Sequence, residues 1–522
     1  MQGAGFVMSG SAAGQGQEIE IKFRTDAAGL ARFLDAPLIK TARDLQTESL
    51  KTTYFDTPSN ALRNKGVILR VRKSGDADPV LGMKAPGAAG NGPFHRKEVE
   101  VNSPSLKPNL ALFDKTTRKF LGQIIDDQPL ATKFKMEIKR QSGLVTSGAS
   151  DVEIAVDQGH IICGKHRVPL AEVELELVSG SKADLIDLAI KLATDFSLRL
   201  DFASKADKGF HALLGEKPAP VKAARIRSKS LATFDDAVTA IISNTLAQFV
   251  ANWACLRETD EPESIHQMRI ALRRMRCGLL MFKRALPHPA FEALRDDAGH
   301  QASIFGPVRN TDAFHISVLE GPLESADRPE SSEALRVIME KKRIAAYVQA
   351  RSEIEKLAAT MFVLKVQRFL ACHDWRKVSA GAEPAKLRVP LRKFSRAALD
   401  RLRARVLKRG KAATGSDEAR HKLRIALKNL RYGVDFFSDL FDNAKRRRAY
   451  KKKLSGLQDL LGTRNDIVGA NKSLKELRAE IEPNAEQIVD FILGWYAKEA
   501  AAADKAFGKS WKKFKQTEIF WK

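Results

Sequence analysis

The sequence predicts an α+β protein, with a curled antiparallel sheet in its N-terminal part and an all-helical C-terminal part. From residue 18 to about residue 215, apolar and charged side chains alternate along several short segments. Such alternation is typical of strands that have two different faces. From about residue 231 onward the alternation disappears, and long segments rich in Ala, Leu, Arg, Lys and Glu show helical spacing. Residues 216–230 are basic and contain Pro218 and Pro220, which predicts a linker between the two parts.

The clearest predicted strand is residues 18–22, Glu-Ile-Glu-Ile-Lys, in which two acids and one base share a face. Similar strands follow at residues 69–72, 96–101, 151–154 and 172–177. One such strand is typical of an ordinary solvated sheet face. Five strands of both charge signs instead predict a concave face with clustered carboxylates and clustered cations. Carboxylates bind hard cations such as Mg²⁺, and Arg and Lys bind phosphate oxygens, so the pattern predicts a site for a metal–polyphosphate.

Length and charge divide the chain in the same way. The chain has 522 residues, which favours two to four domains, and its 44% apolar content is enough for real cores. Residues 1–215 carry 29 Lys and Arg against 26 Asp and Glu, which leaves +22 of the net charge of +25 for the remainder. A helix is predicted over residues 181–196 of the first part. The positive field of the second part predicts a polyanionic partner.

The sequence carries little indication of disulfides, targeting or membrane insertion. The four cysteines are scattered without a Cys-x-x-Cys pair, which favours reduced thiols in a cytoplasm over a disulfide framework or zinc site. Residues 1–17 lack a basic start and a continuous apolar core, so they are predicted to be a flexible leader and not a signal peptide. Since no run approaches 18 apolar residues, a transmembrane helix is not expected.

The C-terminal half contains an internal duplication. Residues 266–276, HQMRIALRRMR, resemble residues 421–431, HKLRIALKNLR, at an offset of 155 residues. A second pair of motifs, residues 306–312 and 462–466, keeps this offset, since Arg309 and Arg464 are also 155 residues apart. Two separate motifs at one offset predict two related helical bundles in tandem.

The first repeated motif places one histidine and three cations on a single helix face in each copy. The two sets are His266, Arg269, Arg273 and Arg276, and His421, Arg424, Lys428 and Arg431. Cations that share a helix face repel unless an anion neutralises them, so the duplicated face predicts a polyanion groove rather than a solvated basic surface. A metal site at the histidines is the weaker alternative, because no carboxylate or second histidine follows at i+4. For the second motif, a Gly–Arg–Asn–Asp turn that caps the next helix is the structural alternative.

The N-terminal part, residues 18 to about 215, resembles the CYTH domain of the triphosphate tunnel metalloenzyme superfamily. The family's mark is Glu-x-Glu-x-Lys on the first strand, which Glu18, Glu20 and Lys22 match. Later strands match the family at Arg70, Arg72, Lys84, Arg96, Glu98, Glu100, Arg140, Glu153, Asp157, Glu172, Glu174, Glu176 and Lys205. The resemblance implies an eight-stranded antiparallel tunnel.

The same resemblance implies an inorganic triphosphatase that depends on Mg²⁺ or Mn²⁺. The phosphates would be bound by Lys22, Arg70, Arg72, Lys84, Arg96, Arg140 and Lys205. The metal would be held by Glu18, Glu20, Glu174 and Glu176, with Glu98, Glu100, Glu153, Asp157 and Glu172 in support. The catalytic set is expected to be Glu18, Glu20, Lys22, Arg70, Arg72 and Lys84. Direct attack by water is favoured, because no Ser, Cys or His nucleophile with a base is evident near these strands.

The C-terminal part, predicted as residues 231–520, resembles the CHAD domain, a duplicated helical domain with paired histidines that often follows CYTH. His266 and His421 match its histidine positions, and family members bind inorganic polyphosphate. The implied polyphosphate residues are His266, Arg269, Arg273, Arg276, Arg309, His421, Arg424, Lys428, Arg431 and Arg464. The resemblance therefore predicts a cytoplasmic protein without a membrane partner, which polyphosphate granules would attract.

Three alternatives remain open on the sequence. The tunnel could act on thiamine triphosphate, or cyclise ATP as class IV adenylate cyclases do. The protein could bind polyphosphate without catalysis, although the intact charged set counts against a vestigial tunnel. The basic half could instead bind nucleic acid, but it lacks a zinc-finger or RNA-recognition signature and aromatic residues make up only 7% of the chain, which disfavours base stacking.

Overall fold

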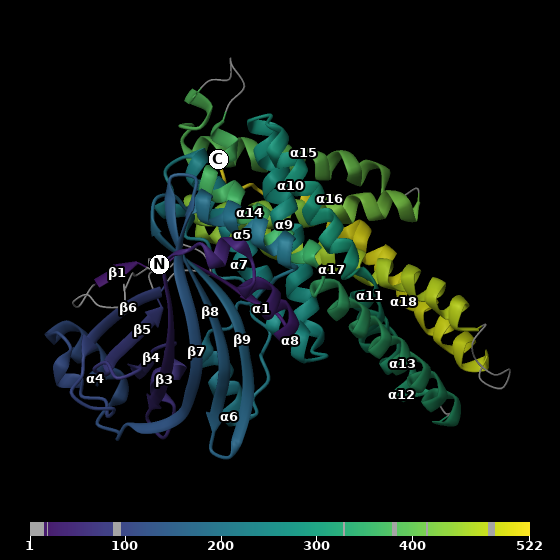
Figure 1. Cartoon of the computed structure of the whole chain (residues 1–522). Coiled ribbons are helices and arrows are strands. Elements are labelled where there is room, and N and C mark those ends of the chain that lie inside the picture. The colour runs from purple at the N-terminus through teal and green to yellow at the C-terminus, as the bar shows by residue number, and fades with distance from the viewer. Residues whose placement is uncertain are drawn as a thin grey trace. The chain divides into compact units, whose positions relative to one another are not determined.

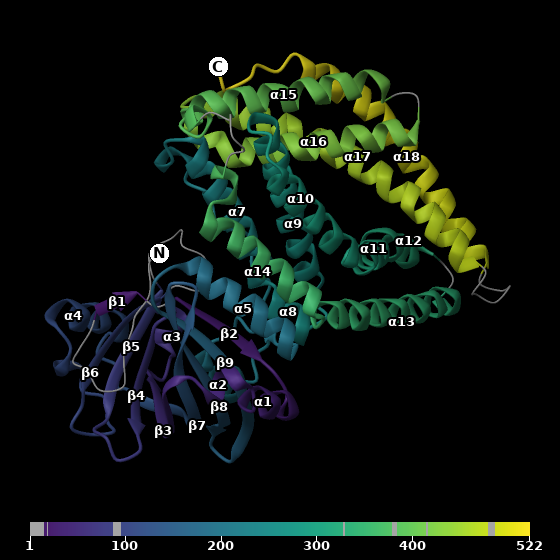
Figure 2. The ribbon, with the colours of Figure 1, turned by 45° about the horizontal axis from the view of Figure 1, so that its top comes forward.

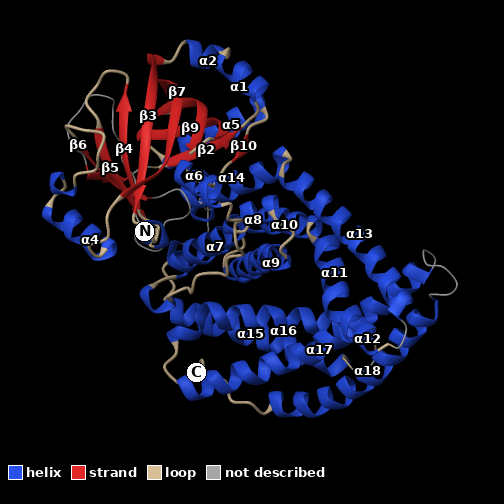
Figure 3. Cartoon of the chain, turned by 90° about the horizontal axis from the view of Figure 1, so that it is seen from below, coloured by secondary structure: helices blue, strands red, loops and turns tan. Residues whose placement is uncertain are grey.

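The computed structural model describes residues 15–17, 19–86, 96–326, 329–377, 384–413, 416–478 and 486–522. It divides into two compact units. The sheet unit holds the described residues up to 219 together with residues 253–259 and 354–374, and the helical unit holds the others. The strands lie in the first unit and long helices make up the second (Figure 3). The predicted α+β class, with an N-terminal antiparallel sheet and an all-helical C-terminal region, is confirmed.

Within the described part of the chain, ten strands form one antiparallel sheet in the order β1-β6-β5-β4-β3-β7-β8-β9-β2-β10 (Figure 1). They are β1 (Gln15–Gln17), β2 (Glu20–Arg24), β3 (Arg43–Asp56), β4 (Ile68–Ser74), β5 (Val80–Pro86), β6 (Arg96–Asn102), β7 (Ala131–Ser147), β8 (Ser150–Cys163), β9 (His166–Ser179) and β10 (Arg199–Leu200).

The expectation of eight strands in a closed tunnel is wrong in its count and its closure. The strands β2 to β9 are the expected eight, and the short β1 and β10 are added at the two edges. Among the described residues, β1 and β10 do not pair with each other. The sheet is nevertheless strongly curled, because β1 pairs with β6 while β2, which follows directly in the chain, pairs with β9. Three residue steps separate Gln17, the last residue of β1, from Glu20, the first residue of β2. These two residues, at and near opposite edges of the sheet, therefore lie within about 11 Å of each other.

The alternation seen in the sequence puts charged side chains of β2, β4, β5 and β6 inside the curl, whereas the apolar residues Leu50, Tyr54, Ile68, Met136 and Ile138 also line the interior. On β2, Ile21 and Phe23 are buried, and Glu20 and Lys22 are half-buried on the opposite face. The outer face of β3 to β6 belongs to an apolar core that includes Leu69, Val71, Leu81 and Met83 and residues of α4. The interior of the curl is thus lined by charged side chains beside apolar ones such as Tyr54 and Met136. It leaves room for a polar site inside the sheet.

The helices of the sheet unit are α1 (Ala27–Leu34), α2 (Pro37–Lys40), α3 (Ala61–Asn64), α4 (Lys115–Ile125), α5 (Lys182–Phe196) and α6 (Lys205–Leu214). The helix predicted over residues 181–196 is confirmed as α5, with Ser181 as its N-cap. Two helices that follow the predicted linker of residues 216–230 also belong to this unit, α8 (Trp253–Glu258) and α14 (Leu357–Cys372). Helix α14 lies beside α5 (Figure 2).

Helix α6 packs against β7 and β8 at a glycine, which suggests a test of how tightly it is held. A methyl group added at Gly209 would lie 2.0 Å from a ring carbon of Phe134 on β7. We therefore expect Gly209→Ala to lower the free energy of unfolding by about 1–3 kcal/mol, as overpacked sites do. The measurement is urea unfolding. The control is Gly122→Ala in α4, where the added methyl meets nothing within 4 Å, and which is expected to stabilise by about 0.5–1 kcal/mol. Equal effects of the two changes would contradict this account.

The helical unit follows the predicted duplication. Its helices are α7 (Phe234–Ala251), α9 (Pro262–Ala285), α10 (Pro289–Ile304), α11 (Gly306–Phe314), α12 (Glu320–Ser325), α13 (Pro329–Ile354), α15 (Leu391–Ala412), α16 (Asp417–Phe437), α17 (Ala444–Arg478) and α18 (Glu486–Lys515). The two copies of the His-containing motif lie in α9 and α16, where α7 packs on α9 in the way that α15 packs on α16 (Figure 2). None of the described helices has both the length and the apolar composition needed to cross a bilayer.

The turn considered as an alternative for the second repeated motif is not present. Arg309 and Asp312 lie within α11, and Arg464 lies well inside α17. Pro307 occupies the first turn of α11, where its missing N–H costs nothing, so the Gly-Pro pair begins a helix instead of ending one. The motif therefore places Arg309 and Arg464 on helix surfaces.

Candidate active site

A cavity of about 160 Å³ lies inside the curled sheet and gathers most of the predicted site residues. Its charged lining consists of Glu20, Lys22, Arg70, Arg72, Lys84, Glu98, Glu100, Arg140, Glu153, Asp157, Glu174, Glu176, Asp201 and Lys205. Three predicted residues are not in this lining. Glu18 and the side chain of Arg96 lie outside the described residues, and Glu172 is fully buried behind the wall.

The first charged cluster lies on the neighbouring strands β4, β5 and β6. The guanidinium of Arg70 is 2.9 Å from Glu98 and 3.0 Å from Glu100. Lys84 lies 2.8 Å from Glu98, and Arg72 lies 3.3 Å from Glu100. Burial by itself raises the pKa of Glu98, but Lys84 and Arg70 hold that pKa well below its ordinary value. Glu98 therefore remains charged although it is buried.

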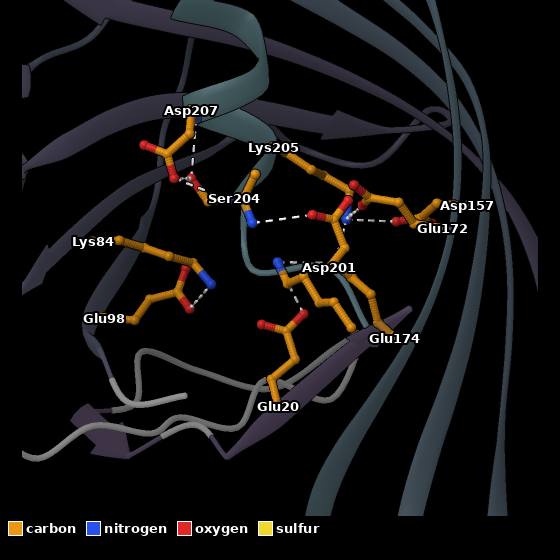
Figure 4. A network of polar contacts seen from close by, with 12 residues as sticks. Glu20, Lys84, Glu98, Asp157, Glu172, Glu174, Asp201, Ser204, Lys205 and Asp207 are labelled. Atoms are coloured by element: carbon orange, nitrogen blue, oxygen red, sulfur yellow. Dashed lines mark hydrogen bonds and ion pairs between the residues drawn. The ribbon is translucent and has the colours of Figure 1, made fainter. Parts of the chain in front are cut away.

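The second cluster is centred on Glu174 of β9. Its carboxylate contacts Lys22 at 3.1 Å, Arg140 at 2.7 Å and also Lys205 of α6. Arg140 forms a two-pronged contact with Asp157, with both bonds 2.7 Å long, and Lys205 is 2.9 Å from the same carboxylate. In Figure 4, Lys205 lies among the carboxylates of Asp157, Glu172 and Glu174, while Lys84 and Glu98 form a separate pair. Bidentate, buried pairs of this kind fix side-chain orientation.

Burial and charge act in opposite directions on this second cluster. Burial disfavours the charged forms of Glu174 and Lys205, but the surrounding opposite charges lower the pKa of Glu174 and raise that of Lys205. Glu153 differs from its neighbours, because burial raises its pKa and Arg140 only partly offsets the effect. The cavity therefore holds a set of fixed charges and one carboxyl group that takes up a proton more readily than usual.

A third row of ion pairs runs from Lys205 through Glu172 and Lys208 to Asp201, and two of its members, Lys208 and Asp201, are absent from the sequence prediction. Glu172 is 2.9 Å from Lys205 and also contacts Lys208. Lys208 in turn lies 2.6 Å from Asp201. Because Lys205 and Lys208 are three residues apart on α6, they lie on the same face of that helix. The spacing of three residues from Lys205 could have predicted that Lys208 lies on the same helix face. No comparable pattern in the sequence predicts the position of Asp201.

The carboxylates of Asp157, Glu172 and Glu174 have the donor chemistry of a divalent-cation site, and in the structure the ammonium group of Lys205 contacts all three. Asp157, Glu172 and Glu174 are buried, and each offers an oxygen within 4.8 Å of the others. Several carboxylate oxygens in one place are the donor set of a hard divalent ion such as Mg²⁺ or Mn²⁺. Glu20, 3.2 Å from Lys22, and Glu176 lie in the same cavity and can complete the set.

The lowered pKa values set the acid sensitivity of the sheet unit. Glu98, Asp157 and Glu174 each have a folded pKa below the ordinary value, so their stabilisation is complete above about pH 4.5 and is lost as the pH falls through the folded pKa. We expect Asp157→Asn to lower the melting temperature at pH 7, and the difference from the unmodified protein to shrink at about pH 3. The measurement is calorimetry at both pH values. A melting-temperature difference that is larger at about pH 3 than at pH 7 would contradict a lowered folded pKa of Asp157.

The helical unit brings together only part of the predicted polyphosphate set. Burial lowers the pKa of His266, and Arg309, Arg273 and Lys428 lower it further because they lie nearby. Burial, Arg273 and Arg309 likewise lower the pKa of Arg269 to about 10. Lys428 comes from the second copy of the repeat, on α16, and the other four come from the first. These five residues are here called the basic face, and the four cations among them repel one another and so favour a bound anion.

The remaining predicted polyphosphate residues have other surroundings. Arg464 lies 3.4 Å from both Asp417 and Asp504, and Arg431 contacts Gln458 at 3.1 Å. Burial lowers the pKa of Arg276, and the neighbouring cation Arg295, which is not part of the basic face, lowers it further. By their spacing, His421 and Arg424 share the α16 face of Lys428.

Comparison with known proteins identifies two domains in series. Residues 16–210 match the CYTH domain, and residues 240–475 match the CHAD domain. A curated relative from Haemophilus influenzae named inorganic triphosphatase is 31% identical over 202 residues, which cover 38% of this chain. The chain spans 56% of the length of that relative.

Solved structures resemble each part separately. The CHAD domain from the plant Ricinus communis is 27% identical and covers 56% of this chain and 94% of its own, with a TM-score of 0.45. A putative adenylyl cyclase from Hippeastrum, described as having a dominant triphosphatase activity, is 17% identical. That match covers 38% of this chain and 97% of the other, with a TM-score of 0.30.

Proposed function

We propose, on the premise that this chain consists of a CYTH domain followed by a CHAD domain, that its sheet unit hydrolyses inorganic triphosphate with a divalent metal. The observation that carries this proposal is the cavity lining, in which six cations and a larger set of carboxylates face one enclosed space. The name of the Haemophilus influenzae relative supports the inorganic substrate.

The cations would bind the phosphate oxygens from two sides. Arg70, Arg72 and Lys84 come from β4 and β5, whereas Lys22, Arg140 and Lys205 come from β2, β7 and α6. Each cation is already oriented by a carboxylate, so little reorganisation is needed when the oxygens of the substrate take over part of these contacts. Preorganised charges in a water-poor site are a large source of transition-state stabilisation.

The metal would be held by Asp157, Glu172 and Glu174, with Glu20 and Glu176 beside them. When bound, such an ion offsets charge on the transferring phosphoryl group. Mg²⁺ and Mn²⁺ both suit an all-oxygen donor set.

Water is the proposed nucleophile, and Glu153 is the group proposed to orient it and accept its proton. Glu153 lines the cavity, and its raised pKa makes it a better base than its neighbours. The hydroxyl of Ser204 is also in the cavity, but it donates to Asp207 at 2.5 Å as the N-cap of α6. Among the described lining residues there is no histidine or cysteine, which supports direct attack over a covalent route.

The test is phosphate release from tripolyphosphate by the full chain, with and without Mg²⁺ or Mn²⁺, beside thiamine triphosphate and ATP. The proposal expects fast release from tripolyphosphate only when metal is present. Preferential turnover of thiamine triphosphate, or formation of cyclic AMP from ATP, would replace the substrate assignment. No turnover of any of the three would favour a protein that binds polyphosphate without cutting it.

For the helical unit we propose binding of inorganic polyphosphate at the basic face. The lowered pKa of Arg269 supports it, because a guanidinium among other cations is stabilised by any anion that joins it. Competition between long-chain polyphosphate and DNA of equal charge tests the ligand class, and tighter binding to DNA would overturn the assignment. Such a face would also hold a cytoplasmic protein on polyphosphate granules.

A further inference from the structure

Helix α8 follows the predicted linker of residues 216–230 in the chain but belongs to the sheet unit. It contacts the segment of residues 201–204, which links β10 to α6 and lines the cavity. Lys205 follows this segment directly, so the backbone position of the segment determines where the ammonium group of Lys205 can reach.

Two contacts join α8 to this segment. The indole of Trp253 meets the ring of Phe202 edge-on, with ring centroids 5.4 Å apart. The guanidinium of Arg257, which also pairs with Glu258, lies 3.9 Å from the carboxylate of Asp201. Trp253 and Asp201 are almost completely buried, whereas the side chain of Arg257 is partly exposed.

The contact at Asp201 continues to the proposed substrate site through consecutive ion pairs. Asp201 binds Lys208, Lys208 binds Glu172, and Glu172 binds Lys205. Burial by itself raises the pKa of Asp201, but Lys208 and then Arg257 hold it below its ordinary value. Removing Arg257 therefore shifts more of Lys208 toward Asp201 and away from Glu172.

The same end of the segment is also held from β10 by α14. The backbone N–H of Leu200 donates to the hydroxyl of Thr360 at 3.1 Å. Glu355, just before α14, contacts Arg24 of β2, and its backbone carbonyl accepts from Arg199 of β10. The end of the cavity-lining segment that follows β10 is thus held by residues that follow the CYTH match in the chain.

We propose that Arg257 and Trp253 are positioning residues of the triphosphate site. They fix residues 201–204 and, through Asp201, Lys208 and Glu172, the ammonium group of Lys205. This inference rests on the proposed function for its activity readout. It makes the sheet unit depend on a helix that lies outside its own sequence domain.

The test uses the full chain with Arg257→Met, Arg257→Lys and Asp201→Asn, and a double variant that combines R257M with D201N. We expect R257M to raise KM for tripolyphosphate about three- to tenfold, with kcat changed by less than about twofold, and R257K to restore most of the loss. The double variant should be no worse than D201N, because Arg257 acts through Asp201. The matched control is Arg368→Met, which removes the ion pair between α14 and Asp187 of α5 and leaves residues 201–204 untouched.

The outcomes separate this inference from the proposed function. If the unmodified protein hydrolyses tripolyphosphate and R257M matches R368M in KM and kcat, the positioning role is overturned and the proposed function stands. If the unmodified protein does not hydrolyse tripolyphosphate, the proposed function fails. The inference is then decided by calorimetric titration with tripolyphosphate alone: a Kd at least threefold weaker for R257M than for R368M supports it, and equal values overturn it. Melting temperatures of all variants identify any that fail to fold.

Discussion

Replacing Glu174 with glutamine is expected to reduce kcat for metal-dependent tripolyphosphate hydrolysis by about a thousandfold or more. Glu174 contacts three cations, Lys22, Arg140 and Lys205, and belongs to the buried acidic cluster. The amide keeps the size of the side chain but supplies no charge to a divalent ion. It also leaves the three cations with less compensation, so they hold the phosphates in unproductive positions.

The measurement is the initial rate of phosphate release over a range of Mg²⁺ concentrations, since a lost ligand also weakens the response to metal. The matched control is Glu137→Gln on β7, an exposed residue whose partner is Arg167 at 3.2 Å, outside the cavity. It should leave the rate unchanged. If E174Q retained a tenth or more of the activity, Glu174 would not be part of the proposed machinery.

Removing three cations of the basic face is expected to weaken binding of long-chain polyphosphate about a hundredfold at low salt. The changes are Arg269→Ala, Arg273→Ala and Lys428→Ala, which take charge from both copies of the repeat. Because bound phosphates release counterions from the ligand, losing three contacts should also reduce the slope of log Kd against log salt by about 2. Binding isotherms at several salt concentrations measure both quantities.

The control for this triple variant removes the same charge from elsewhere in the helical unit. Lys229, Lys283 and Lys422 each pair with an acidic residue away from the basic face, and changing all three to alanine lowers the net charge equally. Binding should then fall much less than in the basic-face variant. Equal losses in the two triple variants would show that net charge alone attracts polyphosphate.

Much of the sheet and its site could be predicted from the sequence, because strand periodicity is a local property. Alternation places Glu20 and Lys22 on the face opposite Ile21, and the structure confirms that face as the inside of the curl. The match of Arg140 to a family position is consistent with its place in the cavity, beside Asp157. The role of each of these residues in binding or catalysis stays a prediction.

The repeat was visible in the sequence for a similar reason, since helix faces follow from spacing alone. His266, Arg309 and Lys428 lie close together because α9, α11 and α16 pack against one another. Residue spacing within one helix does not predict this packing. Spacing likewise did not show that Arg464 lies between two acidic residues. Ion pairs between distant helices depend on where those helices pack, which periodicity does not encode.

The sequence by itself determined the two-part α+β architecture, the charged interior face and the duplicated basic helix. Each follows from local periodicity and composition, which act over one turn or one strand. Only the tertiary structure decided that α8 and α14 complete the sheet unit, and that Lys205 and Lys208 share the carboxylate of Glu172. Those contacts join residues far apart in the chain, and the packing of buried apolar surface selects them, so no short stretch of sequence carries them.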